Sequence, residues 1–137
     1  MRHLPWVFAK VVPHKRQYYD STGNYGECDN LWWMHISELS DWRREACIYI
    51  HEFAEMCLTK SDGVSWADID FFDTEGEGAD HPDPGTLPSA PYYKQHADAT
   101  VIEAMFCKML GVDWDDYNKE LDNLEYKEKP DASVTMP

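Results

Sequence analysis

Hydrophobic and polar residues alternate with two different periods along this chain of 137 residues. Residues 6–12 (Trp-Val-Phe-Ala-Lys-Val-Val) combine aromatic and β-branched side chains and end at Pro13, which is typical of a β-strand. Residues 31–36 have the same character and predict a second strand. Residues 17–30 are rich in turn-forming residues, and we expect a hairpin or a longer excursion there.

A long helix is predicted next, from about Trp42 to Leu58. Ser40 or Asp41 can cap it by accepting hydrogen bonds from its first free N–H groups. Its apolar residues spread over most of the helix circumference, so we expect a helix that is mostly buried. Charged side chains in the middle of such a helix need partners.

Two further helices are predicted near the C-terminus. Pro91 suits the first turn of a helix that runs from about Tyr92 to Leu110, and Gly111 suits its left-handed C-terminal cap. A shorter helix is expected at 114–124. Helices combined with short strands predict an α+β fold, with a small N-terminal antiparallel sheet packed on the buried helix and on the second long helix.

An acidic segment, residues 61–91, separates the two long helices. It holds eight acids, four prolines and four glycines and has no Lys or Arg. We expect loop here, with one short helical turn within 66–72. Residues 73–78 resemble the start of an EF-hand calcium loop, but Pro84 stands where the bidentate glutamate belongs, which argues against that assignment.

Composition and length bound the remaining possibilities. We expect one domain, residues 1–125, followed by a mobile tail at 126–137. A formal net charge of −14 argues against direct binding to a nucleic-acid backbone and fits a basic partner or carboxylates neutralised by cations. No apolar run is long enough to span a membrane, and no signal peptide is recognisable, so a cytoplasmic protein is expected.

The motif His51-Glu52-Phe53-Ala54-Glu55 carries the chemistry of the buried helix. His51 and Glu55 are four residues apart, which places their Cβ atoms roughly 6 Å apart on one face, where both can bind one metal ion. Glu52 is rotated by about 100°. In the His-Glu-x-x-His zinc peptidases this glutamate accepts a proton from metal-bound water. Here Glu55 replaces the second histidine; a carboxylate still binds Zn²⁺, and the change shifts preference toward Mn²⁺.

The second long helix offers a third ligand. His96 and Glu103 lie two turns apart and share a face. We predict that His96 completes the set of metal ligands. Glu103 then serves either as a fourth ligand or as a carboxylate that orients a ligand histidine. Asp70 and Asp73 of the acidic segment are competing donors.

Two other interpretations of these residues remain open. His51 can be a core histidine in a hydrogen-bonded network, with Glu52 and Glu55 on a solvated face. Cys47 lies one turn before His51, which allows a nucleophilic Cys–His pair. A buried, reduced thiol is favoured, because the four cysteines form no Cys-x-x-Cys pair.

The order of these motifs resembles a group of small uncharacterised proteins from tailed bacteriophages and prophages. Members read His-Glu-Leu-Val-Glu on the helix, then Asp-x-Phe-Asp, Pro-Gly, Pro-Tyr-x-x-x-His and Gly-Val-Asp-Trp. The resemblance covers roughly residues 31–120. The corresponding segments of this chain are 51–55, 70–73, 84–85, 91–96 and 111–114.

This group is similar in layout to the minimal zincin metallopeptidases, in which an edge strand precedes the metal-binding helix. The resemblance implies a phage-encoded protein acting in the cytoplasm of the bacterial host. We expect a zinc-binding protein with a zincin-like site, in the class of metal-dependent hydrolases, although Glu55 in place of histidine argues against proteolysis specifically. The alternative is an acidic phage protein that binds and inhibits a host protein, its metal structural or absent.

Overall fold

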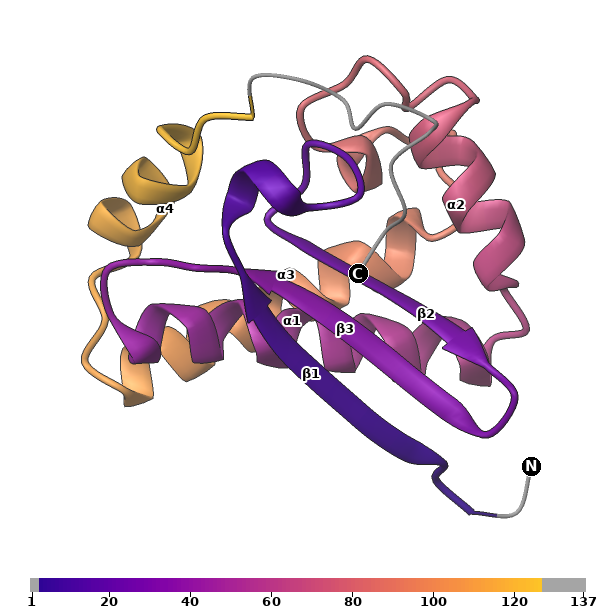
Figure 1. The fold of residues 1–137 in the computed structure, drawn as a ribbon, viewed down its shortest axis with the longest axis horizontal. Coiled ribbons are helices and arrows are strands. Elements are labelled where there is room, and N and C mark those ends of the chain that lie inside the picture. The colour runs from indigo at the N-terminus through magenta and orange to yellow at the C-terminus, as the bar shows by residue number, and fades with distance from the viewer. Residues whose placement is uncertain (1–2, 127–137) are drawn as a thin grey trace.

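The computed structural model describes residues 3–126, which form a three-stranded sheet and four α-helices (Figure 1). The coarse α+β class is therefore confirmed. Most of the predicted tail, residues 127–137, lies outside the described residues. The strands are β1 (Trp6–Val12), β2 (Gly23–Cys28) and β3 (Leu31–Ser37); the helices are α1 (Trp42–Ser61), α2 (Trp66–Thr74), α3 (Tyr93–Met109) and α4 (Trp114–Asp122), with 3-10 turns η1 (His14–Arg16) and η2 (Pro84–Thr86).

The sheet is mixed, so the prediction of an antiparallel sheet was wrong. β3 lies in the middle, β1 runs parallel to it on one side, and β2 runs antiparallel to it on the other. The chain leaves β1 through η1, crosses to the far edge and returns from β2 to β3 in a tight turn, where Asp29 has a φ of 52°. Strand-forming residues predict a strand but not the direction of its neighbour, which explains the error.

β2 lies within the segment that we predicted to be turn-rich. Two of its residues are glycine, which disfavours a strand on propensity alone. Tertiary contacts require both. A Cβ atom at Gly26 would collide with the ring of Trp33 on β3, and a Cβ atom at Gly23 would collide with the side chain of Glu52 on α1. The glycines therefore let a ring and a helix approach the strand closely.

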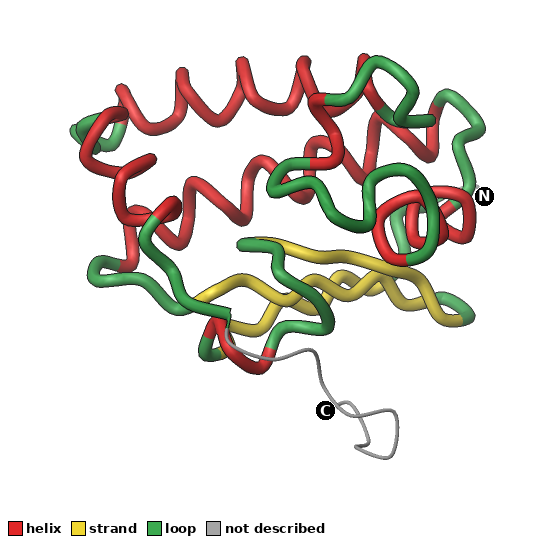
Figure 2. The backbone as a smooth tube through the Cα atoms, turned by 90° about the horizontal axis from the view of Figure 1, so that it is seen from above, coloured by secondary structure: helices red, strands yellow, loops and turns green. Residues whose placement is uncertain are grey.

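α1 is the central helix of the molecule and begins where the sequence predicts. The side chain of Asp41 caps it by accepting a hydrogen bond of 2.8 Å from the backbone N–H of Arg43. α1 packs on β2 and β3, and α3 packs on α1. Figure 2 shows these helices on one side of the sheet.

The acidic segment contains a full helix rather than the single turn that we expected. α2 is nine residues long, and the Ser65 side chain caps it by accepting a hydrogen bond from the backbone N–H of Asp68. Ile69 and Phe72 bury their side chains in a cluster that includes Tyr25 of β2. The apolar surface beside β2 therefore stabilises a helix that its local sequence specified only weakly.

The C-terminal part follows the prediction closely. α3 ends at Met109, and Gly111 adopts the left-handed conformation expected of a C-terminal cap, with a φ of 72°. α4 then packs against α3. Among residues 3–126, none of the helices combines the length and the apolar character needed to cross a membrane.

The buried apolar residues form two separate clusters along α1. One surrounds Met56 and joins the sheet to α2, and the other surrounds Cys47 and Ile48 and reaches Tyr117 of α4. The motif at 51–55 lies between them, so the polar groups of the candidate site sit between two apolar regions. Such groups are costly unless each has a partner.

Candidate metal centre

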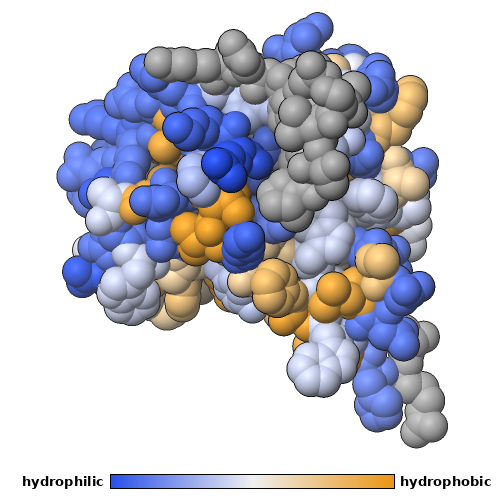
Figure 3. Space-filling model, in the orientation of Figure 1, coloured by the Kyte–Doolittle hydropathy of each residue, from blue (hydrophilic) through white to orange (hydrophobic). Residues whose placement is uncertain are grey.

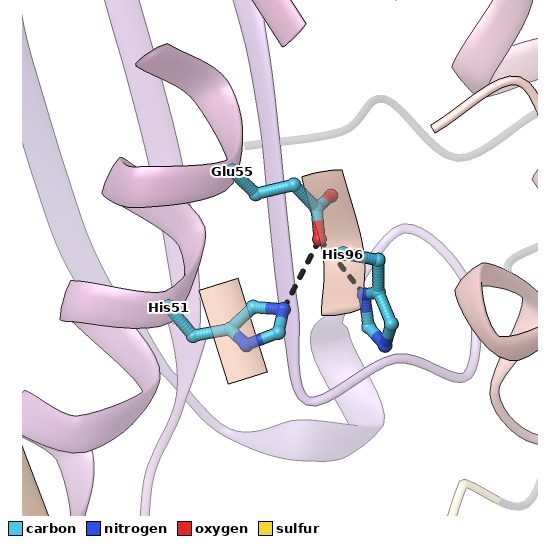
Figure 4. A group of neighbouring side chains, drawn as sticks. All are labelled: His51, Glu55 and His96. Carbon is cyan, nitrogen blue, oxygen red and sulfur yellow. Dashed lines mark hydrogen bonds and ion pairs between the residues drawn. The ribbon is translucent and has the colours of Figure 1, made fainter. Parts of the chain in front are cut away.

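Three potential ligands converge between α1 and α3. His51 and Glu55 project from α1, His96 projects from α3, and one ligand atom from each lies within 4.8 Å of the others. Both imidazole rings approach the same carboxylate oxygen of Glu55 (Figure 4). His51 Nε2 is 3.1 Å from Glu55 Oε2, and His96 Nδ1 is 2.8 Å from it. The structure thus brings together the three residues that we predicted as ligands.

Each of these side chains has a separate partner on the side that faces away from the shared oxygen. Glu103 Oε1 lies 2.8 Å from Nδ1 of His51. Asp83 Oδ1 lies 3.3 Å from Nε2 of His96. The hydroxyl of Tyr25 donates a 2.8 Å hydrogen bond to the second oxygen of Glu55. Partners of this kind fix the orientation of metal ligands and the tautomer of ligand histidines.

The contact between His51 and Glu103 is an ion pair rather than a well-directed hydrogen bond. The two atoms are close, but the Nδ1 atom of His51 has no partner of adequate hydrogen-bond geometry among the described residues. Glu103 is itself held in place, because the hydroxyl of Tyr117 donates a 2.6 Å hydrogen bond to its other oxygen. Glu103 therefore contacts His51 from the side away from Glu55, and both roles predicted for it stay predictions.

The pKa shifts of the three side chains favour a negative charge on Glu55 and positive charges on His51 and His96. Burial alone would raise the pKa of Glu55, but hydrogen bonds from His51 and His96 lower it below its usual range. Burial alone would lower the pKa of His96, but Asp83 and Glu55 raise it to about 9. Burial likewise opposes charge on His51, and Glu103 and Glu55 overcome it and raise the pKa of His51 well above its usual value. Without a metal, these shifts favour a carboxylate between two imidazolium rings.

Two of the three distances between the ligand atoms are close to those around a metal ion. Two ligands of a tetrahedral zinc ion lie roughly 3.3 Å apart when each is about 2.0 Å from the metal. The two contacts of Glu55, at 3.1 and 2.8 Å, are slightly shorter than this. Two imidazoles and one carboxylate are a donor set that catalytic zinc sites use, and such sites leave a fourth position for water.

Glu52 lies beside this group without a partner of its own. Its residue is 8% exposed, and no hydrogen bond or ion pair joins its carboxylate to any other part of residues 3–126. Burial, and then the neighbouring charge of Glu55, raise the pKa of Glu52 above its usual range. A buried acid with a raised pKa is suited to accept and return a proton.

The two aspartates that we considered as competing donors do not join the group. Asp73 is buried, but its carboxylate accepts hydrogen bonds from the hydroxyls of Tyr19 (2.9 Å) and Tyr92 (2.7 Å). Burial raises its pKa to about 6, although both hydrogen bonds act in the other direction. Asp70 lines a small cavity beside His51, Glu55 and His96 but is outside the group of potential ligands.

Two hollows reach the site from different directions. A cavity of about 50 Å³ lies between the sheet, α1 and α2 and has Tyr25, Glu55 and His96 in its walls. A groove of about 320 Å³ runs from His51 and Glu52 toward α4. Since both hollows include Glu52, this carboxylate lies where the site opens to small molecules.

Three supporting residues were not predicted from the sequence. Asp83 lies in the acidic segment, where eight acids compete and no spacing distinguishes one of them. Tyr25 and Tyr117 carry no motif at all, and only the packing of β2 and α4 brings their hydroxyl groups to Glu55 and Glu103. Of these three residues, Tyr117 alone could have been expected to point inward, because it lies on the apolar face of the helix predicted at 114–124.

Comparisons with known proteins add no assignment. No protein-family model matches the chain, and no curated protein and no solved structure resembles it closely enough to count as a match.

Proposed function

We propose that this protein binds one divalent metal ion, Zn²⁺ in the first place, through His51, Glu55 and His96. The observation that carries the proposal is the set of separate partners behind the three ligands. Glu103, Asp83 and Tyr25 each hold one ligand from the side opposite the shared oxygen. Metal sites regularly use such partners to orient their ligands.

The donor set favours zinc and also accommodates Mn²⁺. Imidazole nitrogen suits zinc, and the carboxylate of Glu55 makes the site somewhat harder than one with three histidines. When bound, such a metal polarises a carbonyl oxygen and lowers the pKa of a water molecule on it.

We further propose that the site hydrolyses an amide or a similar bond, with Glu52 as the proton carrier. Its unpartnered carboxylate lies in both hollows, next to the three ligands. In its ionised form, Glu52 would accept a proton from the attacking water and deliver it to the leaving group, so that the carboxylate is regenerated. β2 passes the site as an edge strand, which supports the zincin-like layout implied by the sequence resemblance.

Metal content tests the first part of this proposal. Protein purified without added metal is analysed for zinc and manganese by mass spectrometry, alongside His51→Ala, His96→Ala and Glu55→Gln. His14→Ala is the matched control, because His14 is a buried histidine bonded to Ser37 and Asp20 instead. We expect close to one metal per wild-type and control chain and a large loss in the three variants. A wild-type chain without metal that also fails to bind added zinc would overturn the site.

Glu52→Gln tests the second part. The variant is expected to retain metal and fold and to lose the hydrolysis of a mixture of fluorogenic peptides, esters and amides by at least about 100-fold. Equal rates in wild type and variant would remove Glu52 from the mechanism without affecting the metal assignment.

A second candidate function rests on a different observation. Glu55 hydrogen-bonds directly to one ring nitrogen of each histidine, so the three side chains are held together without a metal. Under this assignment the site only stabilises the fold, and the protein acts by binding a host protein, as the likeness to phage proteins suggests. Stoichiometric metal in the native protein excludes the metal-free form of this candidate.

A further inference from the structure

β1 has a free edge on the side away from β3. Trp6 donates its backbone N–H to Asn30, and Val12 accepts through its backbone carbonyl from Glu38, so both point toward the β3 side. Because backbone groups alternate in direction along a strand, the groups of residues 7, 9 and 11 point the other way. Within the described residues no strand pairs with that side of β1. Three N–H groups and three carbonyls are therefore available to another chain.

The side chains around this edge are unusually exposed for apolar groups. Trp6 is 83% exposed, Phe8 54% and Val11 45%. Figure 3 shows hydrophobic atoms along the line that β1 follows in Figure 1, toward the lower right. α1 packs chiefly on β2 and β3. Val7 packs against the core and Val12 is buried, but the other residues of β1 are exposed. A long, exposed and apolar edge is a site for pairing with another strand.

The charge of this edge is opposite to that of the rest of the protein. The chain has 26 acids, yet none precedes Asp20. Lys10, Lys15 and Arg16 lie on or directly after β1, are exposed, and form no ion pair with any described residue. By contrast, Arg44 and Lys60 are paired with acids. A partner at this edge thus meets apolar side chains and unneutralised positive charge.

We propose that the free edge of β1 binds an extended, acidic segment of a partner protein, which adds a fourth strand to the sheet. Backbone hydrogen bonds to residues 7, 9 and 11 hold the segment, its apolar side chains cover Trp6, Phe8 and Val11, and its acids face Lys10, Lys15 and Arg16. A second copy of the chain is a poorer occupant. Symmetric pairing of two β1 strands would set basic edge against basic edge and bring together two chains of net charge −14.

A labelled peptide tests this surface without any assumption about the metal. The probe is an eight-residue peptide of four valines followed by four glutamates, which places apolar side chains beside Trp6 and Phe8 and acids beside Lys10 when it pairs parallel to β1. It is titrated with the full chain and followed by fluorescence anisotropy. We expect saturable binding that Lys10→Glu weakens by about tenfold or more. Lys108→Glu is the matched control, because this exposed lysine lies on α3, and we expect it to bind the peptide as wild type does.

Two further measurements separate edge pairing from simple attraction of charges. The same peptide with N-methyl groups on alternate residues cannot donate to the carbonyls of the edge, so it should bind at least about tenfold more weakly. Ala9→Pro removes an outward N–H and should have a similar effect, with circular dichroism as the check on folding.

Three results would overturn the proposal: equal binding of a valine–lysine peptide, equal effects of Lys10→Glu and Lys108→Glu, or no loss on N-methylation. Light scattering that shows a dimer disrupted by Lys10→Glu would assign the edge to a second copy instead. Displacement of the peptide by a single-stranded oligonucleotide that itself binds more tightly would assign it to nucleic acid.

Discussion

His51 on α1 and Glu103 on α3 meet across the helix interface, with Nδ1 of the histidine 2.8 Å from Oε1 of the glutamate. Tyr117 of α4 donates a hydrogen bond to the same glutamate, so three helices share one polar contact. The contact restrains the ring of His51 such that Nε2 faces Glu55. A residue that does not touch the shared oxygen thereby contacts one candidate ligand from behind.

Replacing Glu103 by glutamine should weaken metal binding. A carboxylate balances the positive charge that a metal-bound imidazole carries, whereas the amide of glutamine is neutral. Loss of such a partner costs about 10- to 100-fold in metal affinity. Competition with a chromophoric chelator measures the change. Asp98→Asn is the control, since it removes a carboxylate from the same helix whose ion-pair partner among residues 3–126 is the exposed Lys94. Equal affinities for wild type and Glu103→Gln would mean that the ion pair is unrelated to metal binding.

Metal affinity should rise with pH. In the metal-free protein the pKa of His96 is raised to about 9, so at pH 7 its ring holds a proton that a metal must displace. The protonated ring stabilises the metal-free fold fully below the unfolded pKa of about 6.5, and this contribution is lost as the pH rises through about 9. Calorimetry in buffers of different ionisation enthalpy should therefore detect protons released on zinc binding at pH 7. Binding without proton release would contradict the charged state of His96.

Gly23→Ala should disturb Glu52 specifically. A Cβ atom at this glycine would lie 2.5 Å from Oε1 of Glu52, which is too close for either group to remain in place. Overpacking of this kind costs about 1–3 kcal/mol of unfolding free energy. In a Glu52→Ala background the collision is absent, so the same substitution should cost much less. Urea unfolding of wild type, the two single variants and the double variant measures the difference. If the losses of unfolding free energy of the two single variants add up to that of the double variant, the glycine is needed for another reason.

Asp73→Asn should change how stability depends on pH. Burial raises the pKa of Asp73 from 3.8 to about 6, so the folded state favours the protonated acid, and the associated stability is lost as the pH rises through that range. A shift of this size corresponds to about 3 kcal/mol, and the asparagine variant should escape this loss. We expect Asp73→Asn to gain stability relative to wild type between pH 4 and pH 7. If the difference in unfolding free energy between wild type and Asp73→Asn is the same at pH 4 and at pH 7, the raised pKa is contradicted.

Local patterns in the sequence were sufficient for α1, α3 and α4 and for two of the strands. Periodicity and capping residues placed α1 and α3 to within a few residues, and Gly111 marked the end of α3 through its freedom to adopt a positive φ. Helix geometry also placed His51 and Glu55 on one face, because residues four apart must share it. These features depend on neighbours in the chain, which a sequence displays directly.

Contacts between distant segments were decided by the tertiary structure alone. The parallel pairing of β1 with β3 follows from a crossover, and β2 forms despite its glycines because Trp33 and Glu52 pack against them. The partners of the candidate ligands likewise come from segments without a motif, as with Asp83 and Tyr25. Sequence determined which residues are candidate metal ligands, because helix spacing is local. Packing determined which groups orient them, because a buried carboxylate or imidazole requires partners that only the folded chain brings near.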